Sequence, residues 1–267
     1  MSSPLFEIRD VSFRAGGQSI LTDVSWQVDA GQHWAMIGPN GAGKTTLLKI
    51  ACGYIWPNDG GEILRQGKRL VDLRQLRRSM GWVSHRLAAE IPTNESVLDT
   101  VLSGRRGEVG LKHWQHASNP PIEEQNEARQ YLAKLGCSHL TNRPFGVLSQ
   151  GEQQKVLIAR SLMSLPLLVF LDEPCAGLDP GARERFLADL QDLAERSSLP
   201  SLILVTHHIE EITPALENLL IVHDGRITHF GKVHEIINVD LLQQLYGVPV
   251  NDLVRQDGRY WPVLGDR

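Results

Sequence analysis

The stretch GPNGAGKTT, residues 38–46, decides the fold of this chain. It matches the P-loop pattern G-x-x-x-x-G-K-[ST], whose fixed positions hold Gly38, Gly43, Lys44 and Thr45. The apolar segment 34–37 precedes it and the helical segment 47–51 follows, which is the strand–loop–helix context that the motif requires. Glycines let the backbone curl so that N–H groups point inward at a helix start and form an anion-binding concavity. The stretch therefore predicts a nucleoside triphosphate site.

Each part of this loop has an expected role at the phosphates. Lys44 is expected to neutralise the β- and γ-phosphates, and the Thr45 hydroxyl to coordinate Mg²⁺. The loop as a whole is expected to line the bound nucleotide. The predicted nucleotide-binding residues are Gly38, Pro39, Asn40, Gly41, Ala42, Gly43, Lys44, Thr45 and Thr46.

Two carboxylates follow a second apolar segment, residues 167–171. Such a buried strand brings acids at its tip to the carboxyl edge of the sheet, where the P-loop also lies. Asp172 is expected to hold Mg²⁺, and Glu173 to orient or deprotonate the attacking water. A general base contributes about 10²–10⁴ in rate. Without a P-loop the same residues would be interpreted as a solvated turn.

A histidine pair ends another apolar segment, residues 202–205. It should open on the same sheet edge, where His207 can donate to the γ-phosphate and sense whether it is present. His208, one residue further, is expected to be structural.

The segment LSQGE, residues 148–152, stands before a helix with apolar residues at helical spacing. Ser149 is a natural N-cap, and Glu152 falls three residues later, so a structural capping box is one interpretation. A helix start is also an anion site, which is the other.

Strand-like and helix-like segments alternate along most of the chain, which predicts an α/β fold with a mainly parallel sheet. Segments 5–14 and 19–28 have the strand period around a Gly-Gly turn and predict an antiparallel hairpin. Further strands are expected at 33–37, 62–70, 80–84, 167–171, 201–205, 218–223 and 226–230, and helices at 43–52, 122–135, 181–196 and 208–213.

The part between residues 85 and 165 has a helical character. Asn94 is a candidate N-cap for a helix that runs to Leu102, and Pro121 suits the first turn of the next helix. The polar segment 104–120 between them is either functional or disordered. We expect a P-loop core with an antiparallel β subdomain at 1–84 and 166–231, an inserted helical subdomain at 85–165 and a C-terminal extension at 232–267.

Composition excludes several classes of protein. The 267 residues are 42% apolar and 22% charged with a net charge of −4, so nothing draws the whole chain to nucleic acid. Basic residues between 65 and 78 are interpreted as the solvent-exposed face of a short helix and turn, because Leu70, Leu73 and Leu76 alternate with them and predict a buried stripe. The three cysteines lack metal-ligand spacing, so reduced thiols in a cytoplasmic compartment are expected, and the N-terminus lacks a signal-peptide pattern. The apolar run 162–171 is too short to span a bilayer, so any membrane-spanning part is expected to come from another chain.

Five motifs in this order, the P-loop, LSQGEQQ (148–154), LVFLDEP (168–174), AGLD (176–179) and THH (206–208), resemble the ATP-binding-cassette (ABC) ATPase family. The resemblance covers residues 5–230. It implies that two cassettes pair head to tail. The segment LSQGEQQ, called the signature, and the helix that it begins, the signature helix, would then contact the γ-phosphate of ATP held by the other cassette. It assigns Ser149, Gln150 and Gly151 to the partner's ATP, and Asp179 to communication across the interface.

The chain departs from the family pattern at two positions. Ala15 stands where the family has an aromatic residue that stacks on adenine; a lost stacking platform removes about 1–3 kcal/mol of base contact. Phe13 or Arg14 could substitute for it. His85 stands where the family has a glutamine that contacts Mg²⁺ or the water, and we expect it to keep an altered catalytic role. The alternative is that His85 only ends a strand.

Four further features resemble a narrower group of the family, the single-cassette bacterial members labelled molybdate-transport or photorepair type. These features are Trp34, GWVSHRL (81–87), HHIEEI (207–212) and RYWPVL (259–264). The resemblance implies a Mg²⁺-dependent ATPase that dimerises on ATP. It implies a motor at the cytoplasmic face of the membrane, with permease subunits docking near residues 85–118. The rival is a soluble ABC ATPase that acts on nucleic acid or another complex.

Overall fold

The computed structural model describes residues 3–109, 120–196 and 200–265, and the chain forms two compact units. Unit 1 joins Met1–Arg77 to Pro200–Arg267, and unit 2 is Arg78–Leu199. The P-loop falls in unit 1, and the carboxylate strand and the LSQGE segment fall in unit 2. The expected three-part division of the chain stays a prediction.

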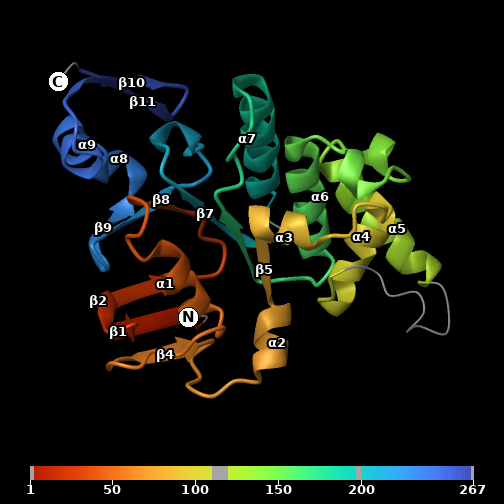
Figure 1. The fold of residues 1–267 in the computed structure, drawn as a ribbon, viewed down its shortest axis with the longest axis horizontal. Helices are drawn as coiled ribbons and strands as arrows, with labels where there is room; N and C mark the ends of the chain where they lie inside the picture. The colour runs from red at the N-terminus through yellow and green to blue at the C-terminus, as the bar shows by residue number, and fades with distance from the viewer. Residues whose placement is uncertain (1–2, 110–119, 197–199, 266–267) are drawn as a thin grey trace. The chain divides into compact units, whose positions relative to one another are not determined.

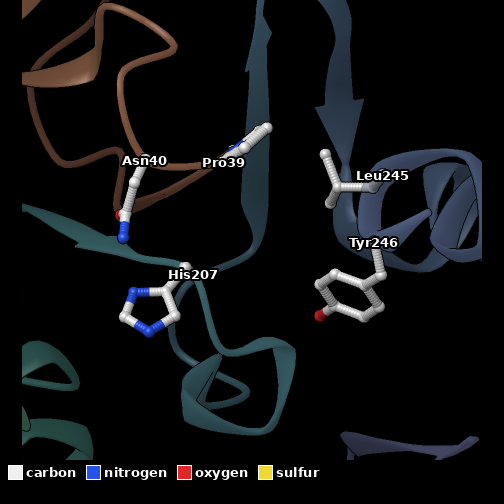
Figure 2. A pocket seen from close by; sticks show the side chains of 6 residues that line it. Pro39, Asn40, His207, Leu245 and Tyr246 are labelled. Carbon is white, nitrogen blue, oxygen red and sulfur yellow. The ribbon is translucent and has the colours of Figure 1, made fainter. Parts of the chain in front are cut away.

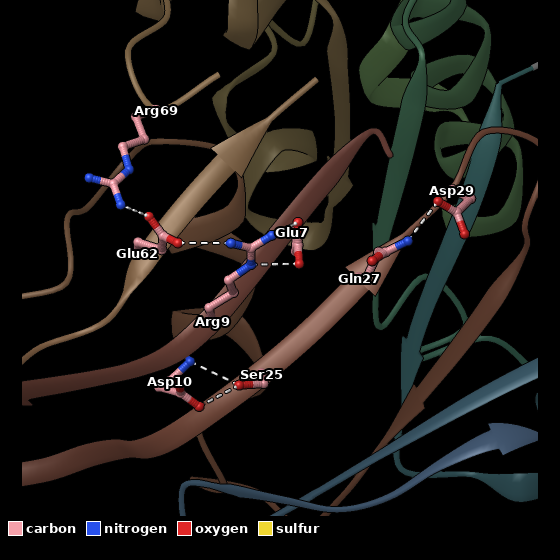
Figure 3. Close-up of polar contacts among 8 residues, drawn as sticks. All are labelled: Glu7, Arg9, Asp10, Ser25, Gln27, Asp29, Glu62 and Arg69. Carbon is pink, nitrogen blue, oxygen red and sulfur yellow. Dashed lines mark hydrogen bonds and ion pairs between the residues drawn. The ribbon is translucent and has the colours of Figure 1, made fainter. Parts of the chain in front are cut away.

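Unit 1 begins with the expected hairpin. Strand β1 (Phe6–Ala15) pairs antiparallel with β2 (Gln18–Val28), and β4 (Glu62–Arg65) pairs with the other edge of β1. On the exposed side Arg9 binds Glu7 and Glu62 (Figure 3), while on the buried side the rings of Phe6 and Trp26 meet edge to face at 4.9 Å. This alternation of charged and apolar residues is what the period-two pattern predicts.

The parallel sheet of unit 1 carries the P-loop. Strand β3 (Trp34–Ile37) is buried throughout and lies between β7 (Ser201–Thr206) and β8 (Asn218–His223), both parallel to it. Strand β9 (Arg226–Lys232) extends this sheet antiparallel to β8. Such apolar strands occur where both faces of a parallel sheet are covered.

Helix α1 (Lys44–Ala51) follows the P-loop, and Arg65 stabilises its far end. The Arg65 guanidinium is 1% exposed and donates to the backbone oxygens of Ile50 and Ala51, at 2.6 and 2.9 Å. A cation at a helix C-terminus satisfies carbonyls that have no partner in the helix and interacts favourably with the dipole.

The C-terminal extension belongs to unit 1 and is drawn in blue in Figure 1. It contains α8 (Val233–Ile236), α9 (Val239–Tyr246) and the antiparallel pair β10 (Val250–Gln256) and β11 (Arg259–Leu264). Asn238 caps α9 by accepting a hydrogen bond from the Leu241 N–H at 2.9 Å. Strand β11 packs against η5 (Ile209–Glu211), the turn that follows β7.

Unit 2 combines two parallel strands with a group of helices. Strands β5 (Met80–Ser84) and β6 (Leu168–Asp172) pair in register. Helix α6 (Gln150–Leu162) packs against β5, α4 (Val97–Ser103) and α5 (Ile122–Lys134). The helices are α3 (His85–Glu90), α4 (Val97–Ser103), η1 (Gly104–Arg106), α5 (Ile122–Lys134), η3 (Ser138–Leu140), η4 (Phe145–Val147), α6 (Gln150–Leu162) and α7 (Pro180–Ala194), while α2 (Leu73–Arg78) lies at the boundary with unit 1.

The prediction that Asn94 caps α4 is wrong. Ser96 is the N-cap, and its hydroxyl accepts from the Asp99 N–H at 3.1 Å. The N–H groups of Val97 and Leu98 bond to carbonyls of residues 143 and 141, so a distant segment fixes where the helix begins.

Two further expectations need correction. Leu70 is 88% exposed, so the buried stripe of the basic segment is reduced mainly to Leu76, which is 7% exposed. The helix expected at 208–213 is only the 3₁₀ turn η5. Of the polar segment 104–120, residues 110–119 lie outside the described residues, as does part of the expected docking region.

None of the helices in residues 3–109, 120–196 and 200–265 combines the length and apolarity that a membrane crossing needs.

Candidate nucleotide-binding site

The P-loop lies so close to its neighbours that two of its positions accept only glycine. A Cβ on Gly38 would lie 2.0 Å from the backbone oxygen of Val222, and one on Gly43 would lie 2.8 Å from Cδ2 of Leu21. Gly43 also has a φ of 102°, which residues with a side chain rarely adopt. The motif glycines therefore bring the loop into contact with β8 and β2.

Lys44 is a buried cation inside this loop. It is 6% exposed, and its Nζ donates to the backbone oxygens of Gly38 and Pro39 at 2.7 and 3.0 Å. Gly43, the N-cap of α1, has no side chain that could satisfy the N–H groups of the first turn. A buried ammonium and a helix start together form a site for phosphate oxygens.

His207 belongs to the same edge of the sheet as the P-loop. Ile37 and Thr206 are register partners in β3 and β7, so Gly38 and His207 extend from neighbouring strand ends. A cavity of about 220 Å³ lies there, with Asn40 and His207 on one side and Leu245 and Tyr246 on the other (Figure 2). Its lining residues are Gly38, Pro39, Asn40, His207, Leu245 and Tyr246.

The turn after His207 is fixed from within. The Thr206 hydroxyl donates to the Glu211 carboxylate at 2.5 Å and accepts from the His208 N–H at 3.0 Å. Thr206 and Glu211 are 1% and 3% exposed, so this small network lies inside unit 1. The imidazole of His208 lies 3.3 Å from the Glu210 carboxylate, which fits its expected structural role.

The predicted carboxylates and His85 come together in unit 2. Ser84 and Asp172 are register partners at the ends of β5 and β6, so the next residues, His85 and Glu173, leave adjacent strand ends. Glu173 has a φ of 49°, an unfavourable value for a residue with a side chain, and such strain concentrates at functional sites. His85 also begins α3, whose N-cap is Ser84.

Ser149 and Glu152 form a complete capping box at the start of α6. The Ser149 N–H and hydroxyl both donate to the Glu152 carboxylate at 2.8 Å, and the Ser149 Oγ accepts from the Glu152 N–H at 3.4 Å. Burial works to raise the pKa of the Glu152 carboxyl, but the hydrogen bonds from Ser149 outweigh it, so this pKa lies below its usual 4.5. The structural interpretation of this motif is thus confirmed, and Ser149 remains exposed at the helix start.

The loop before α7 lies beside the start of α6. A Cβ on Gly177 would lie 2.6 Å from the side-chain oxygen of Gln150, and one on Gly151 would lie 3.7 Å from Leu178. Asp179 caps α7 by accepting from the Ala182 N–H at 2.9 Å. Within unit 2, therefore, the residues assigned to a partner's nucleotide are neighbours, of which Ser149, Gln150 and Asp179 are exposed and Gly151 is buried.

At the hairpin turn, where the family resemblance predicts an aromatic residue for stacking on the base, three residues are candidates or replacements. Ala15 is exposed at the hairpin turn, and Phe13 is half-buried. The Arg14 guanidinium donates to the backbone oxygen of Gly17 at 3.2 Å and lies 4.0 Å from the Asp59 carboxylate. Arg14 is thus held at the turn, and its stacking on the base stays a prediction.

The residues expected to hold Mg²⁺ have the right chemistry for it. A hydroxyl and a carboxylate are the hard oxygen ligands that Mg²⁺ prefers, and it keeps waters and substrate phosphates as the rest of its shell. Among the described residues no group of three or more His, Cys, Asp or Glu could hold a metal ion. Thr45 in unit 1 and Asp172 in unit 2 each offer one oxygen ligand of the kind that Mg²⁺ prefers, and their role as its ligands stays a prediction.

Sequence reasoning did not identify Leu245 and Tyr246, which line the cavity at the P-loop. They follow the loop by about 200 residues, and neither belongs to a motif. The apolar stretch 236–245 was the one available signal, and it predicts only a packed element.

Known proteins resemble this chain along most of its length. The family model described as ABC transporter matches residues 21–176. A putative ABC transporter ATP-binding protein of Streptococcus mutans is 36% identical over 96% of this chain and 97% of its own, and the ABC transporter ATP-binding protein YlmA of Bacillus subtilis is 35% identical over 95% of each. Among solved structures, cbiO1 of Clostridium perfringens, part of the ABC transporter complex cbiONQ, superposes with a TM-score of 0.76 at 25% identity, covering 88% of this chain and 90% of that one.

These matches confirm the expected α/β P-loop fold and support the narrower molybdate-type likeness only loosely. The matched region contains the P-loop, the signature helix and the carboxylate strand whose geometry is given above. The chain therefore belongs to the ABC transporter family, as an ATP-binding subunit that hydrolyses ATP.

Proposed function

We propose that this protein hydrolyses ATP-Mg²⁺ as a head-to-tail homodimer and so drives separate membrane permease subunits. The observation that carries the proposal is that one chain holds two separate anion-binding helix starts. Buried Lys44 lies in the glycine loop before α1, and exposed Ser149 lies at the start of α6.

The first half of the site binds the nucleotide and prepares the attack. Lys44 and the N–H groups at the start of α1 bind the phosphates, and Thr45 and Asp172 would hold Mg²⁺. When bound, Mg²⁺ would supply charge neutralisation for the phosphate oxygens. Glu173 orients and deprotonates the water, while His207 donates to the γ-phosphate. His85 contacts the same water or the ion shell.

The second half of the site comes from the partner copy. Ser149 and the N–H groups at the start of α6 bind the γ-phosphate, and Gln150 and Gly151 complete that surface. Asp179 lies next to it and reports its occupancy across the interface. The Ser149 hydroxyl bonds to Glu152 and would turn toward the phosphate when the two copies close.

The family and the name of cbiO1, which is part of an ABC transporter complex, support a permease partner. The docking surface lies on the helical subdomain near residues 85–118, of which the structure describes 85–109, and the protein works at the cytoplasmic face of the membrane.

The Glu173→Gln variant tests the proposal. It keeps nucleotide binding and removes the base, so ATP-Mg²⁺ should trap a dimer that light scattering after size-exclusion chromatography detects. Glu123→Gln, which removes a charge from the exposed start of α5, is the control and should remain monomeric after turnover. A monomer of Glu173→Gln at saturating ATP-Mg²⁺ would contradict the head-to-tail site.

A further inference from the structure

The C-terminal extension reaches the segment that follows His207, and three contacts join them. Arg259 at the start of β11 donates from Nε to the backbone oxygen of Glu210 at 3.1 Å, and its Nη2 donates to the same oxygen. A Cβ on Gly258, in the turn before β11, would lie 3.0 Å from the Pro214 ring. Tyr246 at the end of α9 lines the cavity that His207 also lines (Figure 2).

Tyr246 is held against η5 as well. Its burial raises the pKa of the phenol to about 12, and the nearby Glu210 carboxylate acts in the same direction, while a hydrogen bond with the backbone of Ile209 acts against them. The hydroxyl therefore lies at the backbone of Ile209, two positions after His207.

Arg259 is itself held in place. Its guanidinium lies 5.0 Å from the centre of the Trp261 ring, and the neighbouring Tyr260 is 5% exposed. A planar, stacked guanidinium loses little freedom on making two bonds to one acceptor. The extension thus presents a rigid donor to the carbonyl of η5.

We propose that the C-terminal extension positions His207 for the γ-phosphate, with Arg259 and Tyr246 as its positioning residues. The segment after β7 is fixed from inside by Thr206 and Glu211, and the extension fixes it from outside. His207 is exposed, and its ring lies 4.1 Å from the ring of His208, whose imidazole in turn lies 3.3 Å from the Glu210 carboxylate. The contacts of the extension with residues 209 and 210 therefore reach the His207 ring through this segment. The proposal rests on the role of His207 in the proposed function.

Arg259→Ala removes the clamp without touching the P-loop or the carboxylates. We expect kcat for ATP to fall about ten- to hundredfold, because small misplacements of a catalytic group cost that much, while the KM for ATP changes less than about twofold. Arg259→Lys, which keeps one donor, should recover part of the loss. Arg255→Ala is the matched control: its guanidinium lies over Tyr260 in the same hairpin, and it should retain full activity.

A double variant shows whether Arg259 acts through His207. His207→Ala with Arg259→Ala should be no slower than His207→Ala alone, since residues that act as one unit are not additive. Additive losses of kcat would overturn the proposal. A fall in the melting temperature of Arg259→Ala together with a loss of nucleotide affinity as large as its loss of kcat would also overturn it, because these changes indicate a purely structural role.

A readout without turnover separates this proposal from the proposed function. In nucleotide-free protein with ¹³C-labelled histidine, the His207 ring signal, assigned with His207→Ala, should shift in Arg259→Ala and Tyr246→Phe but not in Arg255→Ala. An unmoved His207 signal would overturn the positioning role even if the enzyme hydrolyses ATP. A shifted signal in a protein without ATPase activity would contradict only the proposed function.

Discussion

Lys44 is the residue on which phosphate binding depends most. A buried ammonium needs partners, and here the backbone oxygens of Gly38 and Pro39 hold it inside the loop before any nucleotide arrives. The cation is therefore pre-positioned where the β- and γ-phosphates are expected. Neither carbonyl carries a full charge, so phosphate oxygens would be stronger acceptors.

Replacing Lys44 by alanine should weaken ATP binding about ten- to hundredfold and reduce hydrolysis to background, since a hydrogen bond to a charged group contributes about 1.5–3 kcal/mol. Titration with a fluorescent ATP analogue measures the affinity. Lys49→Ala, on the exposed face of the same helix, is the control and should bind as the wild type does. Unchanged ATP affinity in Lys44→Ala would refute the assignment of the phosphate site.

His85 and Glu173 show how much a single residue adds to a motif. Both follow adjacent strand ends, and His85 stands at the position where the family resemblance predicts a glutamine. A histidine can donate or accept through one ring nitrogen, which lets it replace an amide at a water. The strained backbone of Glu173 supports a functional role for this edge.

At the scale of elements, the capping box of α6 links helix stability to pH. The folded-state pKa of Glu152 is depressed, so its stabilising contribution is present above its usual value of 4.5 and is lost as the pH falls through the lower folded value. Ser149 supplies the hydrogen bonds, so the cap and the proposed anion site share one residue.

The Glu152→Gln variant should lose about 0.3–1 kcal/mol of unfolding free energy at pH 7, because a carboxylate near a helix start interacts with the dipole. The difference from the wild type should shrink as the pH falls below about 4. Urea denaturation at a series of pH values measures it. A difference that is constant from pH 7 to pH 3 would show that the Glu152 charge does not stabilise α6.

Local patterns predict the elements that local forces determine. The Gly-Gly hairpin, α5 and the P-loop helix all follow from period, turn and cap residues in their own segments. The start of α4 does not, because hydrogen bonds from its first N–H groups to the carbonyls of residues 141 and 143 set it. The same holds for Leu70, whose helical spacing predicts burial but whose segment leaves it in solvent.

The candidate site divides along the same line. Motif residues could be predicted from the sequence, because each lies at a strand end or a helix start that the pattern of its own segment predicts. Leu245, Tyr246 and Arg259 could not, because they meet the cavity of His207 and the residues of η5 across 37–49 positions of sequence and share no motif with them. Such contacts depend on the packing of the whole unit.

At the scale of the whole molecule, the account requires that each ATP is bound by the P-loop of one copy and the signature helix of another. Ser149→Arg should then remove hydrolysis and spare binding at the variant's own P-loop. Lys44→Ala should lose the function of its own P-loop site, and it should still offer an intact Ser149 to the P-loop site of a partner. Two inactive variants thus carry complementary halves of one site.

Mixing Ser149→Arg with Lys44→Ala tests this most directly, with native mass spectrometry to confirm that mixed dimers form. Half of the dimers should be mixed, each with one complete site of two, so hydrolysis should recover to about a quarter of the wild-type rate. The control mixes Lys44→Ala with Glu173→Gln, which damage the same half and should stay inactive. Mixed dimers of Ser149→Arg and Lys44→Ala that hydrolyse no ATP would contradict the shared site.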